Sequence, residues 1–157
     1  MRSLFYILFA VGLFTASDGI ADERHDHHHH GDASLDQLEL NEGEKWAGDE
    51  HLRRGMQGIR EAFVAIHDRV RDGEADSNDY KSLANAIDEQ VQYMFANCHL
   101  DPEPDAQLHV ILANLMQAAD TLRGEENRYP GVHRVHQSLD AYGDTFEHKD
   151  WTPVGHH

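Results

Sequence analysis

The sequence predicts an all-α protein that folds as an antiparallel up-down-up-down four-helix bundle. In four separate segments, apolar residues recur at steps of three and four, which is the period of an amphipathic helix. Short connections containing Gly, Pro, Asn or Asp separate these segments, and short connections make neighbouring helices antiparallel. No stretch alternates between apolar and polar residues for long enough to predict a strand.

The first two helices are expected on either side of a turn near Asp72-Gly73. The first begins after the capping residue Asp49, and its inward stripe comprises Leu52, Met56, Ile59, Phe63, Ile66 and Val70. The second begins at the capping cluster Ser77-Asn78-Asp79, and its stripe ends on the only cysteine of the chain. This second stripe comprises Tyr80, Leu83, Ile87, Val91, Met94 and Cys98.

The third helix is expected over 103–122, after the turn HLDPEP. A proline fits in the first helical turn because the N–H that it lacks would have no helical partner there. The expected inward residues are Leu108, Ile111, Leu112, Leu115, Met116, Ala119 and Leu122. The loop EENRYPG leads to the fourth helix, which carries Val132, Val135, Leu139, Tyr142 and Phe146 inward. The segment before the first helix is expected to pack Leu38, Leu40 and Trp46 over one end of the bundle.

The N-terminal residues predict a cleaved secretory signal. Arg2 precedes an apolar run over 4–14, which is too short to span a bilayer. Small residues allow cleavage after Ser17 or Ala21. We therefore expect a periplasmic protein with no membrane insertion.

The expected organisation is a signal peptide at 1–21, a His-rich disordered tail at 22–37 and one bundle domain at 38–152. The whole chain has 13 Lys and Arg against 29 Asp and Glu, a net charge of −16. This charge argues against a nucleic-acid partner and against adhesion to anionic lipid, and it is compatible with attracting cations.

The tail contains a tract of histidines. Such a tract has no apolar periodicity and binds divalent copper, zinc or nickel weakly. Capture of metal ions and a tail without function are both open interpretations. The residues concerned are His25, His27, His28, His29 and His30.

Four side chains are predicted to meet at one pole of the bundle. In an up-down-up-down order, the start of the first and third helices shares a pole with the end of the second and fourth. This brings together Met56, Met94, Cys98 and His109. A thiolate, thioethers and an imidazole form a ligand set that copper(I) prefers, whereas zinc would use the cysteine and the histidine and gain little from a thioether. We therefore predict a copper(I) site at this pole.

Other histidines are secondary candidates. His99 and His148 are second-tier ligands of the same pole, whereas His67, His133 and His136 are expected at the far pole, where a second surface metal site is an alternative. For the first-tier residues a structural explanation also remains open. The methionines and the cysteine can simply be core residues, and His109 can be paired with Asp105.

Two sequence blocks, KWAGDEHLRRGMQGIR and CHLDPEPDAQLH, resemble those of a group of small secreted helical-bundle proteins of proteobacteria. That group shares a Lys-Trp…Gly-Met…Ile-Arg block and a Cys-x-Leu-x-Pro…Leu-His block. The resemblance covers about Lys45 to Leu122 and implies that Met56, Cys98 and His109 belong to one pattern. It implies no particular activity.

The architecture also resembles the periplasmic four-helix b-type cytochrome. That resemblance implies haem iron held by a methionine of the first helix, which Met56 matches, and by a histidine near the end of the fourth. The match to that histidine is weak, because Tyr142 and Phe146 hold the inward positions and His148 lies off the stripe. The absence of Cys-x-x-Cys-His excludes covalently attached haem.

Three functions follow from these residues. The first is a copper-binding protein for buffering, delivery or resistance, which passes its metal ion to a protein partner. The others are a b-type haem electron carrier and a metal-free helical adaptor. An enzyme is not expected, because the sequence contains no Ser-His-Asp order, Gly-rich phosphate loop or paired Glu-x-x-His.

Overall fold

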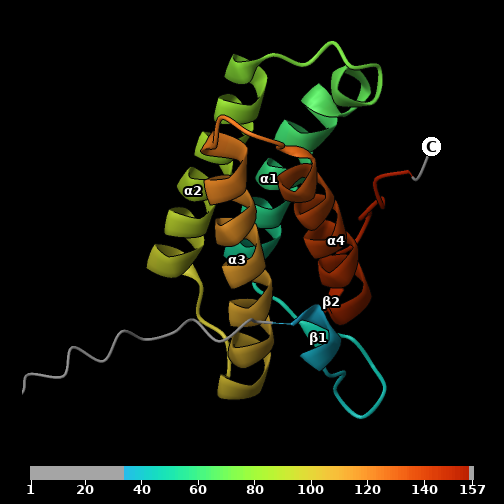
Figure 1. Cartoon of the computed structure of the whole chain (residues 1–157). Coiled ribbons are helices and arrows are strands. Elements are labelled where there is room, and N and C mark those ends of the chain that lie inside the picture. The colour runs from blue at the N-terminus through green and yellow to red at the C-terminus, as the bar shows by residue number, and fades with distance from the viewer. Residues whose placement is uncertain (1–33, 156–157) are drawn as a thin grey trace, which may run out of the picture.

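The computed structural model describes residues 34–155, and its core is a four-helix bundle, as predicted (Figure 1). The predicted signal at 1–21 and the histidine tract lie outside the described residues. Consecutive helices pack against each other, and the loop between the second and third helices lies at the opposite end from the other two loops (Figure 1). The helices are α1 (Glu50–Arg71), α2 (Ser77–Asn97), α3 (Pro102–Arg123) and α4 (Tyr129–Thr145).

Side-chain caps begin the first two helices. The carboxylate of Asp49 accepts a hydrogen bond from the Leu52 N–H, at 2.7 Å. In α2 the cap is Asp76, one residue before the predicted cluster, and it forms a capping box with Asp79. Helix α4 begins at Tyr129 and has a proline in its first turn.

Most residues of the predicted apolar stripes form the core, and Val70, Tyr80 and Cys98 are partly buried against it. Met116 is 42% exposed, so it was wrongly placed in the inward stripe of α3. The packed face of α3 ends before Met116 and extends on its other side to Asn114 and Ala118. Leu40, which was expected to pack over one end of the bundle, is 45% exposed. Leu38 and Trp46 do pack against the core, as expected.

A short parallel strand pair, which the sequence did not predict, joins the two ends of the bundle domain. Strand β1 (Trp46–Ala47) pairs with β2 (Phe146–Glu147), with Trp46 opposite Phe146. Two residues are too few to show an alternating pattern, which explains why the sequence missed them. The pairing fixes the segment before α1 beside the end of α4 (Figure 1).

Segments on both sides of the predicted 38–152 domain also belong to the folded unit. The 3-10 helix η1 (Leu35–Gln37) lies against α3. After β2, the C-terminal segment bridges α1 and α4, because Arg60 donates to the Thr152 carbonyl at 2.6 Å and His136 donates to the Val154 carbonyl at 2.9 Å. Val154 is buried. Among the described residues, no helix has the length and apolar character needed to cross a membrane.

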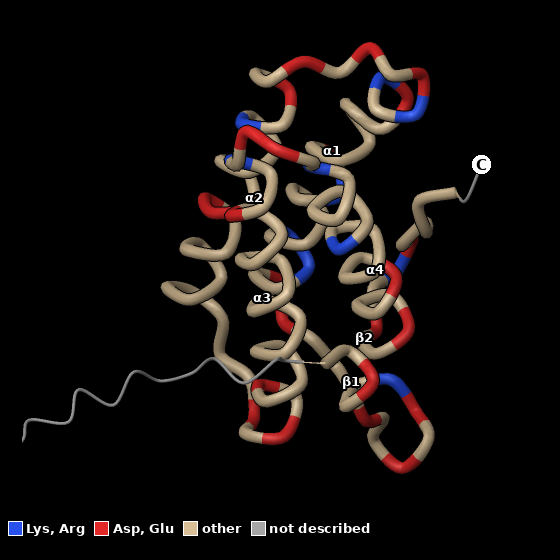
Figure 2. The backbone as a smooth tube through the Cα atoms, viewed as in Figure 1, with Lys and Arg blue, Asp and Glu red and all other residues tan. Residues whose placement is uncertain are grey.

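Acidic residues are numerous at the pole at which β1 and β2 lie. Figure 2 shows their positions on the backbone along the segment before α1, at the start of α3 and around the end of α4. Basic residues in the same region are Lys45, Lys149 and, at the start of α1, Arg53 and Arg54. The pole therefore carries an excess of negative charge.

The crossing of α1 and α2 depends on Gly55, and we predict that Gly55→Ala destabilises the protein. A Cβ atom at this position would lie 2.6 Å from the sulfur of Met94, which is fully buried. We expect the free energy of unfolding to fall by about 1–3 kcal/mol, because overpacking outweighs the better helix propensity of alanine. Urea denaturation followed by circular dichroism measures this change.

Gly58→Ala in the same helix is the matched control. There the added Cβ would meet the amide end of Gln90, a half-buried side chain that can move aside. We expect this variant to be as stable as wild type or up to about 1 kcal/mol more stable. Equal effects of the two substitutions would show that the Gly55–Met94 contact does not limit the helix crossing.

Candidate functional site

The structure brings Met56, Met94 and Cys98 to the same end of the bundle. Met94 packs into the space that Gly55 leaves open, and Gly55 directly precedes Met56 in α1. Cys98 caps α2 one turn after Met94, and its N–H donates to the Met94 carbonyl at 2.9 Å. Both methionines are at most 1% exposed, whereas the cysteine is half-buried. The three sulfur-containing side chains thus lie at the same end of the α1–α2 pair, with Cys98 one turn beyond Met94.

The Cys98 thiol lies beside the carboxylate of Asp49, which accepts a hydrogen bond from the N–H of the next residue, His99. Burial raises the pKa of Cys98 to about 12, and the negative charges of Asp49 and Asp105 add to this effect. The thiol is therefore protonated at neutral pH. A reactive cysteine needs a lowered pKa, so this environment does not favour a nucleophile.

Asp49 holds several groups of the pole together. Its carboxylate lies beside the thiol and accepts the Leu52 N–H and the His99 N–H, each at 2.7 Å. Burial alone would raise the pKa of Asp49, but the hydrogen bonds from these backbone N–H groups lower it overall. The carboxylate stays ionised at neutral pH and connects the start of α1 to the end of α2.

The end of α4 adds a phenol and an imidazole to this pole. The Tyr142 hydroxyl lies 2.9 Å from Nδ1 of His148, and the two groups share a hydrogen bond. Burial raises the pKa of Tyr142; the positive charge of Arg53 opposes that rise, and the charges of Cys98 and Asp49 add to it. Burial, followed by the charge of Arg53, lowers the pKa of His148, so its imidazole is neutral at pH 7.

The two other predicted imidazoles lie towards the solvent. The His109 side chain is 55% exposed, and its Nδ1 donates to the Asp105 carbonyl at 2.9 Å. Its ring lies 5.7 Å from that of Phe95. His99 is exposed, and its Nδ1 donates to the Asn97 carbonyl at 2.7 Å. The pairing of His109 with Asp105, which the sequence left open, is therefore present in the structure.

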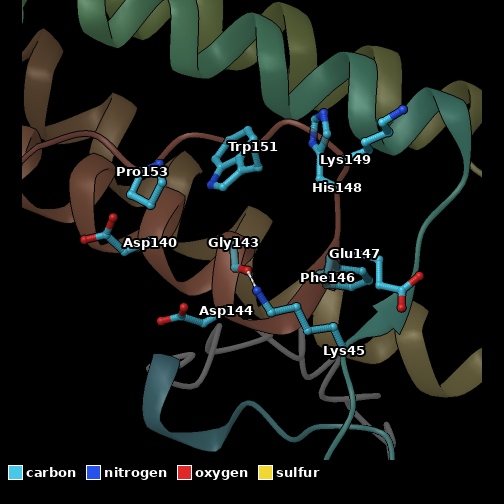
Figure 3. Close-up of a pocket in the computed structure, with 10 residues that line it drawn as sticks. All are labelled: Lys45, Asp140, Gly143, Asp144, Phe146, Glu147, His148, Lys149, Trp151 and Pro153. Carbon is cyan, nitrogen blue, oxygen red and sulfur yellow. Dashed lines mark hydrogen bonds between the residues drawn. The ribbon is translucent and has the colours of Figure 1, made fainter.

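A shallow pocket of about 690 Å³ lies on the outer side of the pole (Figure 3). Its lining includes Lys45, Gly143, His148 and Trp151, and the Lys45 ammonium donates to the Gly143 carbonyl. The ring of Trp151 packs edge-on against Tyr142, with centroids 4.8 Å apart. Within residues 34–155, the indole nitrogen of Trp151 is the buried side-chain nitrogen that lacks a hydrogen-bond partner.

The described side chains do not form a preassembled site of three or more His, Cys, Asp or Glu ligands. A metal ion at the pole would therefore need the methionine sulfurs or a change of side-chain rotamers. Haem fits this pole poorly. Met56, Tyr142 and Phe146 are each at most 1% exposed, and the rings of Tyr142 and Phe146 stack at 5.6 Å, so haem would have to displace packed core residues.

Sequence reasoning missed the roles of Asp49 and Tyr142 at this pole. Asp49 was interpreted only as a helix cap and Tyr142 only as a core residue. The signal that could have identified Tyr142 is a hydroxyl at an inward position of a buried stripe, because a buried hydroxyl needs a hydrogen-bond partner.

No family model, curated protein or solved structure matches this chain.

We predict that Cys98 reacts slowly with alkylating agents in the folded protein. Because burial and Asp49 keep the thiol protonated, alkylation by iodoacetamide at pH 8 should be on the order of 10- to 100-fold slower than in the urea-unfolded chain. Asp49→Asn should speed the folded-state reaction several-fold, because it removes a negative charge while keeping a good helix cap. Mass spectrometry of timed samples measures both rates.

Asp101→Asn is the control for this experiment, because Asp101 lies in the same loop and does not contribute to the shifted pKa of Cys98. Its alkylation rate should equal that of wild type. Equal rates in the folded and unfolded chains would contradict the protected environment that we describe.

Proposed function

We propose that this protein binds copper(I) in the periplasm, at the pole formed by the ends of the helices, and serves in copper buffering, delivery or resistance. One observation carries the proposal. The only cysteine lies half-buried one helical turn after the buried Met94, whose thioether packs against Gly55 beside Met56, and the carboxylate of Asp49 interacts with its thiol. Copper(I) favours such soft donors over oxygen ligands.

His148 is a better candidate than His109 for an imidazole ligand. It is half-buried and hydrogen-bonded to the buried Tyr142 hydroxyl. If Nδ1 donates to the phenol oxygen, the lone pair of Nε2 is left to bind a metal ion, and a hydrogen bond of this kind commonly orients metal-bound histidines. His109 and His99, in contrast, are exposed at the surface of the pole, where they could bind a copper ion on its way to the sulfur ligands.

The charges of the pole favour exchange of a proton for a cation. Asp49 and Asp105 raise the proton affinity of Cys98, and the same negative field attracts a monovalent metal ion. On binding, the thiol would lose its proton to solvent and the thiolate would bind copper(I), with no change in the oxidation state of either group. The histidine tract, His25 to His30, would capture copper ions outside the domain.

The main competing function is a metal-free helical adaptor. It is favoured by the complete burial of Met56 and Met94, which is the usual environment of methionines that only fill a core. Zinc is less suited than copper(I), because the described residues lack a group of three zinc-type ligands. The two functions differ in one measurable property, which is copper(I) affinity in the absence of the histidine tract.

We predict that Cys98→Ala weakens copper(I) binding most. The background is the mature chain with the tract histidines replaced by Gln, and affinity is measured by competition with a chromophoric copper(I) chelator under anaerobic conditions. Loss of the only anionic soft donor should weaken binding about 100-fold or more. Met56→Leu, Met94→Leu and His148→Gln should each weaken it less, by about 10-fold.

Met116→Leu is the matched control for the two methionine variants. The leucine substitutions keep most of the side-chain volume, so their cost in stability is below about 1.5 kcal/mol. Met116 is exposed on α3, away from the pole, and its substitution should leave copper(I) affinity unchanged. The same affinity in Cys98→Ala and in the background would refute the copper site and favour the adaptor.

Copper(I) binding should also release about one proton per ion at pH 7. The thiol, with a pKa raised to about 12, is protonated before binding and deprotonated after it. An indicator dye in weakly buffered solution measures the release. Affinity should fall as the pH falls, because protons compete for the thiolate and the imidazole. Copper(I) binding without proton release would show that the thiolate is not a ligand.

A further inference from the structure

We propose that the outer face of α2 and α3 binds a second copy of this chain, so that the protein forms a weak antiparallel dimer. The inference does not depend on the proposed copper(I) function. It rests on where charged residues are missing, on the apolar side chains that are exposed there and on the net charge of the chain.

Two neighbouring stretches of the bundle lack charged residues. Neither 90–100, from α2 into the loop after it, nor 106–119 of α3 contains Asp, Glu, Lys or Arg, although these make up 27% of the chain. Figure 2 shows both stretches in tan, and the two helices pack against each other. Together they form an uncharged face. Its surface residues are Gln92, Phe95, Ala96, His109, Ala113 and Met116.

Large apolar side chains are exposed on the uncharged face. Phe95 of α2 is 55% exposed and Met116 of α3 is 42% exposed. The ring of Phe95 lies 5.7 Å from that of His109, which places it beside α3. Single apolar residues are common on protein surfaces, but apolar residues on a face without charges are typical of an interaction surface.

Val64 of α1 shows the contrast. It is 45% exposed, close to the value for Met116, but the charged and exposed Glu61 and Asp68 lie one turn before and after it on the same helix. A partner at this position would have to desolvate those carboxylates. Exposure alone therefore does not distinguish the two surfaces, whereas the absence of charge does.

The net charge of the chain indicates which partner fits the uncharged face. With a net charge of −16, two copies repel each other wherever their acidic surfaces would meet. The uncharged face allows them to approach without placing carboxylates in contact. A basic partner would instead be attracted to the acidic pole. Residues 22–33 fit the face poorly, because they contain four acidic residues and no large apolar residue.

The positions of Phe95 and Met116 favour an antiparallel order of the two copies. Phe95 lies level with His109, and Met116 comes seven residues after His109, or about 10 Å farther along α3. A two-fold axis perpendicular to the helices would place each Phe95 ring against the Met116 thioether of the second copy, a favourable sulfur–aromatic contact. It would also place the two acidic poles at opposite ends of the dimer.

The uncharged face is small for an interface. Two helices, each about 10 Å wide and charge-free over about 20 Å, offer roughly 400 Å² per copy. A standard interface buries about 800 Å² per partner. We therefore expect a dissociation constant on the order of 10–100 µM.

Sedimentation equilibrium of the mature full-length chain tests the dimer, with EDTA and a reductant present to prevent association through metal ions or Cys98. We expect a monomer–dimer equilibrium between about 1 µM and about 1 mM. Raising the salt concentration should strengthen association several-fold, because salt screens the repulsion of like charges and the contact contains no ion pairs. A dimer that salt weakens would overturn the proposal. So would a chain that stays monomeric, whether residues 22–33 or another protein covers the face.

Substitutions on the uncharged face locate the contact. Phe95→Glu and Met116→Glu should each weaken dimerisation at least tenfold, and the exposure of both side chains makes misfolding an unlikely cause. Gln92→Glu, which adds a charge without removing an apolar group, should weaken it several-fold. Val64→Glu is the matched control and should dimerise within twofold of wild type. Equal effects of Val64→Glu and Phe95→Glu would refute this face as the contact.

A mixing experiment tests the antiparallel order. Phe95→Lys and Met116→Glu should each be mainly monomeric alone. In a mixed dimer, the new lysine would lie opposite the new glutamate, and the native Phe95 and Met116 would form the second pair. The mixture should therefore associate at least tenfold more tightly than either variant alone. No gain on mixing would overturn the antiparallel order, and circular dichroism of each variant confirms that it is folded.

Discussion

The carboxylate of Asp49 is the interaction on which the pole depends. It caps α1, accepts the His99 N–H at the start of the α2–α3 loop and lies beside the Cys98 thiol at the end of α2. One ionised side chain thus fixes the start of one helix and the end of the next. Because its pKa is lowered by these bonds, it remains charged at neutral pH and keeps the neighbouring thiol protonated. The fold at this end of the bundle and the metal binding that we propose there share the same group.

Around this carboxylate, the pole combines soft sulfur atoms inside with polar groups towards the solvent. Met56, Met94 and Tyr142 are buried, whereas Cys98 and His148 are partly exposed and lie at the boundary with solvent. In the function that we propose, a proton is exchanged for a copper(I) ion at this boundary.

The helices and most of their inward stripes could be predicted from the sequence, because periodicity and caps are local signals. The meeting of Met56, Met94 and Cys98 also followed, because helix order and residue position determine which end each residue occupies. The Tyr142–His148 hydrogen bond and the Trp46–Phe146 pairing could not be predicted, since each depends on how the chain turns after α4. The exposure of Met116 was missed because periodicity does not fix where the packed face of a helix ends.

The β1–β2 pairing has a consequence for the order of folding. Trp46 and Phe146 are neighbours in space although they lie near opposite ends of the folded domain. Contacts between residues this far apart in sequence form late, because closing so long a loop costs chain entropy. The helices α1 and α2 can pair early, yet the pole cannot close until α4 has docked. A chain that is still emerging, or one cut before residue 146, would expose Cys98 without the groups that shield it.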